Sequence, residues 1–143
     1  MTRLQRLKFS RTADVEFVQT LKARVAEYFE DKQIAKQGNA GMVVKTVSLL
    51  LLYLAPLGFI ISGFVSHPFL LFIMWVMMAI GMIGIGMSIM HDANHGSYSK
   101  NPKVNKALGY LINIVGGSAI VWKIQHNVLH HSFTNIDGHD GDI

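Results

Sequence analysis

A long stretch of this sequence carries no charged side chain. Positions 46–90, 45 in a row, contain no Asp, Glu, Lys or Arg. A helix that crosses the hydrocarbon core of a bilayer needs about 20 consecutive apolar residues, so the stretch predicts two membrane spans joined by a short turn. Pro68 is the turn signal nearest its middle. We therefore expect spans at residues 43–65 and 69–90.

Composition favours a membrane protein over a soluble one. Half of the 143 residues are hydrophobic and 15% are charged, whereas soluble domains carry about 25% charged residues. A soluble chain of this length has too little other sequence to cover an apolar hairpin on all sides. The first apolar run starts near residue 42, too far along the chain for a cleaved signal peptide. Because cysteine is absent, disulfides, cysteine-ligated zinc and iron–sulfur clusters are excluded.

Basic residues flank the apolar stretch on both sides. Nine of the 13 Lys and Arg residues precede position 46, four follow position 90, and the expected turn has none. The positive-inside rule then places both ends of the chain in the cytosol. Lipid headgroups account for the net charge of +4, and we expect no nucleic-acid partner.

We divide the chain into a cytosolic lead-in, residues 1–41, and a membrane domain, residues 42–143. The pattern of the lead-in predicts a surface helix over residues 13–33, with Thr12 as its N-cap. Apolar side chains recur there at the spacing of one helix face: Phe17, Leu21, Val25 and Tyr28.

Small residues and a proline punctuate the membrane domain. Pro56 lies inside the first span, where membrane helices tolerate the bend it causes. One stretch of the second span has little side-chain bulk because it contains Gly81, Gly84 and Gly86. We expect it to permit the close approach of another helix.

Residues 107–122 are again uncharged but are few for a span, and they include Gly116-Gly117. We predict an interfacial or re-entrant helix there. A true third span would carry His126 to the opposite side of the membrane from His91.

Five of the seven histidines lie in two short groups. His91 and His95 belong to HDANH, and the second group, HNVLHH, holds His126, His130 and His131. Residues i and i+4 share one face of a helix, so each group presents at least two imidazoles together. If the intervening segment folds back without crossing the membrane, both groups meet at one surface and form a metal site.

The types of residue limit which metals fit the site but do not identify one metal. Imidazole suits iron, copper, nickel and zinc. Asp92 and Asn127 stand where a zinc protease of the HExxH kind needs glutamate, and a haem takes one ligand on each face. Five ligands exceed one tetrahedral site, which favours two metal ions. Nearby carboxylates that can orient the rings are those of Asp92, Asp137, Asp140 and Asp142. Asn94, Trp122, Gln125 and Asn135 flank the histidines, and we expect them to pack around the site.

The two histidine groups, placed after a hydrophobic hairpin, resemble the histidine boxes of the membrane fatty acid desaturases. The run WKIQHNVLHHSFTNIDGHDGDI resembles in particular the bacterial linoleoyl-CoA desaturases and the front-end acyl-lipid desaturases. The resemblance implies a membrane protein with four spans and two irons. It implies no catalytic side chain beyond the metal ligands. The implied ligands in this chain are His91, His95, His126, His130 and His131. Implied partners are an acyl-CoA or acyl-lipid substrate, O2, and an external electron donor, either a ferredoxin or a cytochrome b5-like protein.

Two departures from the family pattern bear on activity. No third box of the form HxxHH or QxxHH follows His131, where His139 stands alone, and the second pair of spans is absent. We therefore expect an N-terminal fragment that is inactive alone, from a protein of the bacterial inner membrane. The alternatives are a related histidine-box hydroxylase or ketolase and a non-catalytic membrane protein that binds metal. The predicted fold class is an all-α integral membrane protein: a transmembrane hairpin with a cytosolic N-terminal helix and cytosolic histidine-bearing helices.

Overall fold

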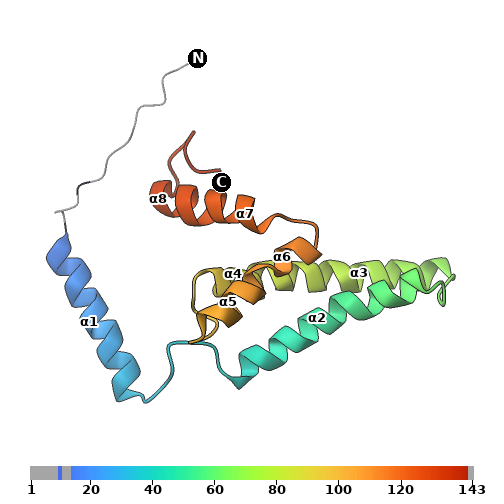
Figure 1. The fold of residues 1–143 in the computed structure, drawn as a ribbon, viewed down its shortest axis with the longest axis horizontal. Helices are drawn as coiled ribbons and strands as arrows, with labels where there is room; N and C mark the ends of the chain where they lie inside the picture. The colour runs from blue at the N-terminus through green and yellow to red at the C-terminus, as the bar shows by residue number, and fades with distance from the viewer. Residues whose placement is uncertain (1–9, 11–13, 142–143) are drawn as a thin grey trace. The chain divides into compact units, whose positions relative to one another are not determined.

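The computed structural model describes residue 10 and residues 14–141 (Figure 1). Across these residues the secondary structure is helical and contains no strand, which confirms the predicted all-α class. The chain separates into two compact units, residues 1–36 and 37–143. Each unit is described by itself.

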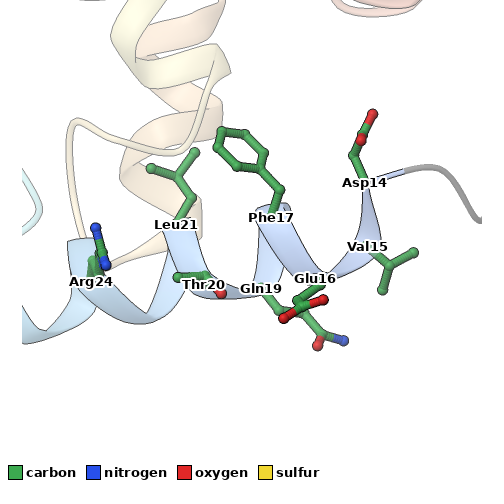
Figure 2. A pocket seen from close by; sticks show the side chains of 8 residues that line it. All are labelled: Asp14, Val15, Glu16, Phe17, Gln19, Thr20, Leu21 and Arg24. Atoms are coloured by element: carbon green, nitrogen blue, oxygen red, sulfur yellow. The ribbon is translucent and has the colours of Figure 1, made fainter.

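The first unit is built around one amphipathic helix, α1 (Val15–Asp31). The helix predicted over residues 13–33 thus corresponds to α1, and its predicted cap, Thr12, lies outside the described residues. None of its residues is buried within the structure. Figure 2 shows a hollow lined by eight residues from Asp14 to Arg24, with Phe17 and Leu21 projecting from one side of the helix. The hollow is therefore part of the surface of α1.

The second unit opens with a helical hairpin. Its first arm is α2 (Ala40–Ile61), and its second arm runs without interruption through α3 (Pro68–Gly84), η1 (Ile85–Met90) and α4 (His91–Asn94). Both arms are long and apolar enough to cross a membrane. The two predicted spans thus correspond to two long apolar helices, with their ends displaced by a few residues, and the crossing of a bilayer by each stays a prediction.

The ends of the hairpin helices follow from the local sequence. The Asn39 side chain caps α2 by accepting a hydrogen bond from the backbone N–H of Met42 at 3.2 Å. α2 then continues as one helix through Pro56. Gly63, at φ 70°, turns the chain after α2, and Pro68 occupies the first position of α3, where its missing N–H costs no helical hydrogen bond.

Glycine allows the two arms to pack closely. A Cβ atom at Gly81 would lie 2.8 Å from the backbone nitrogen of Tyr53 and 3.1 Å from the carbonyl oxygen of Leu49. A Cβ atom at Gly84 would meet the Leu49 side chain, whereas nothing lies within 4 Å of such an atom at Gly86. The predicted close approach is thus made at Gly81 and Gly84.

The core of this unit lies at the histidine-bearing end of the hairpin. Ile85, Ile89, Ala93 and Tyr98 are buried there as one cluster. The Tyr98 hydroxyl is hydrogen-bonded to Oγ1 of Thr46 at 2.8 Å and so ties the segment after α4 to α2. Because Ile89 and Ala93 bracket His91, this packing fixes the direction in which α4 presents its histidines.

The rest of the chain forms a second, shorter run of helices: α5 (Pro102–Gly109), α6 (Leu111–Ile114), α7 (Ala119–Trp122), η2 (Lys123–His130) and α8 (His131–Phe133). The helices before and after the break at residues 115–118 are bent by 116°. Gly116, at φ 93°, lies in this break. Residues 107–122 therefore contain a sharp reversal rather than one continuous helix, and Figure 1 shows α7 and α8 turned back from α6. Their position relative to the bilayer stays a prediction.

Candidate metal centre

The first two histidines stand at the end of the second membrane helix. His91 begins α4, and His95 follows its last residue as the C-cap. Their ring centroids are 4.5 Å apart, as the i, i+4 spacing on one helix face predicts. The buried Ile89 and Ala93 on the other faces of this turn leave the imidazoles directed out of the core.

The first two histidines of the second group lie on a π-helical segment, η2, and His131 follows directly as the first residue of α8. The π-helical geometry changes which of these residues share a face. Hydrogen bonds from i to i+5 give the π-helix more than four residues per turn. Residues i+4 and i+5 therefore lie on either side of residue i. The ring centroids of His130 and His131 accordingly lie 5.1 Å and 4.9 Å from that of His126.

The reversal at residues 115–118 brings the two groups together. Nε2 of His91 lies 3.2 Å from Nε2 of His126. One nitrogen atom from each of His91, His95 and His126 can be chosen so that all three lie within 4.8 Å of one another. His131 joins the cluster through His95, with ring centroids 4.8 Å apart. All five predicted histidines thus belong to one connected group of rings.

The nitrogen spacing fits a metal ion. With metal–nitrogen bonds of about 2.0–2.1 Å, two nitrogens on one ion lie about 3–3.4 Å apart, which matches the 3.2 Å between His91 and His126. The donor set is imidazole throughout, which suits first-row transition metals. The residues present therefore fit a histidine-bound metal.

The electrostatic surroundings favour the neutral, metal-binding form of His95. Desolvation lowers the pKa of this imidazole below its ordinary value. Repulsion from neighbouring histidines lowers the pKa further, and the Asp92 carboxylate opposes the shift. Because a metal ligand must be deprotonated, a lowered pKa makes His95 available to a cation over a wider pH range.

Carboxylates contact the cluster at two points. The buried Asp140 carboxylate accepts a hydrogen bond from Nδ1 of His130, with its oxygens 2.9 Å and 3.0 Å away. The Asp92 carboxylate lies 3.5 Å from Nδ1 of His91, and both side chains are about one-third exposed. Asp137 is exposed, and Asp142 lies outside the described residues. The structure therefore distinguishes the three described aspartates, which the sequence left equivalent.

Two flanking residues pack against the histidine segments. The Trp122 ring stacks on His126, with centroids 4.4 Å apart and planes at 24°. Asn94 donates from Nδ2 to the sulfur of Met90 at 2.9 Å, and a Cβ atom at Gly109 would lie 2.5 Å from Oδ1 of Asn94. The sequence placed Trp122 and Asn94 beside the site, but it did not indicate the role of Gly109.

The other two histidines have different positions. His67 lies in the turn of the hairpin as the N-cap residue of α3, at the opposite end of that arm from His91. His139 packs on Phe133, with ring centroids 5.3 Å apart.

Fold and site together define a class: a helical membrane protein whose second membrane helix and a following folded-back segment assemble a histidine-rich metal centre. Comparison with known proteins gives the family. The model of the fatty acid desaturase family matches residues 66–143, which contain all five clustered histidines. No solved structure is significantly similar to the chain.

Curated relatives agree with this match. The chain is 34% identical over 143 residues to the sn-1 linoleoyl-lipid 6-desaturase of Synechocystis sp., covering 100% of this chain and 39% of that protein. It is 36% identical over 132 residues to the enzyme of the same name from Arthrospira platensis, covering 90% and 35%. An acyl-lipid (8-3)-desaturase of Physcomitrium patens is 37% identical over 139 residues, covering 96% and 28%. The chain belongs to the fatty acid desaturase family and spans about two fifths or less of the length of these relatives.

Proposed function

We propose that the full-length protein introduces a double bond into an acyl chain of a membrane lipid, with O2 as oxidant and two iron ions as the metal centre. The observation that carries the proposal is the convergence of His91, His95 and His126, whose ligand atoms come within 4.8 Å of one another from two separate parts of the chain. His130 and His131 complete the set of ligands that we propose for this chain.

The reaction needs a redox metal. Two neighbouring C–H bonds break and one C=C bond forms, so the acyl chain gives up two electrons and two protons. O2 takes up these, together with two electrons from an external donor and two protons from solvent, to give two waters. Bound iron supplies the redox chemistry for C–H bonds that acid–base side chains cannot break. Within this chain, the imidazoles hold the metal as neutral donors, and the hairpin keeps them at the end of a membrane helix, where a lipid chain is within reach.

The names of the relatives favour a lipid-linked substrate. They describe desaturases of acyl-lipids, including linoleoyl-lipid. We therefore place an acyl-lipid ahead of an acyl-CoA as substrate. A ferredoxin or a cytochrome b5-like protein is the proposed electron donor, and both ends of this chain are proposed to face the cytosol from a bacterial inner membrane.

Expression of the full-length protein in a host that lacks its product tests the proposal. We expect membrane lipids with an additional double bond, and about two irons for each purified protein molecule. An alcohol in place of the double bond would identify a histidine-box hydroxylase instead. Membrane-inserted protein that contains no iron and makes no product would show a non-catalytic protein.

A further inference from the structure

The segment that follows the second histidine group folds back onto it. Asp140 lies ten residues beyond His130, yet its carboxylate contacts the His130 ring. The return is made by turns in which the backbone N–H groups of His139 and Asp140 donate to the carbonyl oxygen of Ile136 at 3.1 Å and 3.0 Å. Asn135 and Gly138 take the left-handed conformation, at φ 62° and 74°, which asparagine and glycine tolerate best.

The Asp140 carboxylate is held from two sides. Its side chain has no exposed surface, whereas that of His130 is 24% exposed. In addition to its contact with the His130 ring, the Asp140 carboxylate accepts a hydrogen bond from the backbone N–H of Asn135, with Oδ2 2.8 Å from that nitrogen. A carboxylate is costly to bury without such partners. The segment after His130 therefore places one buried negative charge directly behind one imidazole.

The chemistry of this contact determines the tautomer of His130. An ionised carboxylate only accepts hydrogen bonds, and a neutral imidazole has one N–H. The proton must then reside on Nδ1, which leaves the lone pair on Nε2. The other ring nitrogen of a histidine ligand is commonly held in this way, and the carboxylate also makes the ring a stronger donor to a cation.

We propose that Asp140 is a positioning residue of the metal centre, which fixes His130 as an Nε2 ligand and adds one negative charge beside a cluster of neutral imidazoles. The inference rests on the proposed function, because it assigns His130 to the iron site. Asp92, the described carboxylate beside His91, is not equivalent: it approaches Nδ1 of His91 at 3.5 Å, beyond a good hydrogen bond, and is partly exposed. Among the described aspartates, Asp140 is thus the one with a buried contact to a proposed ligand.

The substitution Asp140→Asn tests the tautomer directly. The remaining carbonyl oxygen can still accept from the Asn135 N–H, so the turn keeps its anchor. The new amide NH2 takes the place of Oδ1, 3.0 Å from Nδ1 of His130, where it can donate but no longer accept. The carbonyl oxygen at the Oδ2 position remains 2.9 Å from Nδ1, but an N–H on Nδ1 would then face the amide N–H. We therefore expect the imidazole proton to move to Nε2, which removes the lone pair from the proposed ligand atom. A purely structural role for Asp140 predicts no such change.

The measurement uses full-length protein with ¹⁵N-labelled histidine, stripped of metal by a chelator. Nitrogen NMR separates the two tautomers, and the His130 signals are assigned by their loss in His130→Gln. We expect the Nδ1–H form in the unsubstituted protein and the Nε2–H form in Asp140→Asn. Reloaded with iron, Asp140→Asn should lose it to a competing chelator at a concentration about 10–100-fold lower. Asp137→Asn is the matched control, because it removes one exposed charge from the same segment and should change neither result.

Several outcomes would overturn the inference. One is an Nε2–H form of His130 in the unsubstituted protein, a result that requires no variant to fold. Another is Asp140→Asn with unchanged iron retention, and a third is Asp137→Asn with the same loss. The proposed function is judged separately, by the lipids made by the unsubstituted protein. A protein that binds iron through His130 but forms no double bond refutes that function and leaves the role of Asp140 standing.

Discussion

Replacing Gly81 by alanine should force apart the two membrane helices α2 and α3. The added Cβ atom would lie 2.8 Å from the Tyr53 backbone nitrogen and 3.1 Å from the Leu49 carbonyl oxygen, whereas ordinary contact begins near 3.4 Å. Both neighbours are backbone atoms, so no side-chain rotation relieves the clash. The helices must separate by about 0.6 Å at this point, and a gap of about 0.5–1 Å forfeits a quarter to a half of the dispersion energy of the contacts it opens.

The size of the stability loss is obtained by comparing alanine substitutions at three glycines. Overpacking of this kind costs about 1–3 kcal/mol. Alanine favours a helix over glycine by about 1 kcal/mol, but this gain is shared by Gly58→Ala, where nothing lies within 4 Å of the added atom. The difference between the two variants isolates the clash, and we expect Gly81→Ala to be less stable by about 1–3 kcal/mol. Gly84→Ala should fall between them, because its new atom meets the Leu49 side chain, which can rotate away.

The assay is equilibrium unfolding of the full-length protein in mixed micelles with increasing SDS. Iron content is measured on the same samples, because α3 continues through η1 into the histidines of α4. Separation of the helices should therefore lower iron retention as well as stability. Equal unfolding free energies for Gly81→Ala and Gly58→Ala would refute the reasoning, as would Gly84→Ala being the least stable of the three.

Three further predictions test the site and its support. His95→Ala and His130→Ala should each abolish double-bond formation without preventing membrane insertion, measured by lipid analysis and membrane fractionation; desaturated product from either variant contradicts the ligand assignment. Thr46→Val leaves the buried Tyr98 hydroxyl without its 2.8 Å partner and should lower the unfolding free energy by about 1–3 kcal/mol. The double variant Thr46→Val/Tyr98→Phe should recover most of that loss. Unfolding free-energy changes that simply add in the double variant would contradict a direct hydrogen bond between the two side chains. His67→Ala, in the turn of the hairpin, should leave product and iron content unchanged, and loss of either would link the turn to the centre.

The hairpin was predictable because its signal is local and strong. An uncharged run of 45 positions has few stable arrangements, since each backbone N–H and C=O in a bilayer needs a partner within its own helix. Pro68 marks the turn for a similarly local reason, because proline at the first position of a helix costs no hydrogen bond. The ends of α2 and α3 were less well predicted, because capping by Asn39 and the turn at Gly63 depend on short polar segments with weak preferences.

The histidine site was predictable in its members but not in its geometry. The i, i+4 spacing pairs His91 with His95 on any helix. On an α-helix, however, His131 would lie about 140° around the helix axis from His126. The π-helical form of η2 brings both His130 and His131 beside His126. A π-helix leaves no pattern of a few residues that distinguishes it from an α-helix, so the sequence alone did not indicate it.

The choice among the aspartates also required the fold. In the sequence, Asp92 is adjacent to His91, whereas Asp140 is ten residues from His130. The fold nevertheless brings the buried Asp140 within hydrogen-bonding distance of the His130 ring, because the left-handed Asn135 and Gly138 turn the chain back.

The sequence by itself thus determined the membrane hairpin, the two histidine groups and the chemistry that imidazole offers a metal. Tertiary structure alone decided that the two groups meet, through the 116° reversal between α6 and α7. The physical reason is the distance along the chain over which each interaction acts. Hydrophobic runs and helical spacing act over a few residues and can be read along the chain. The 3.2 Å approach of His91 to His126 joins residues on separate helices, and its geometry depends on the packing of the whole unit.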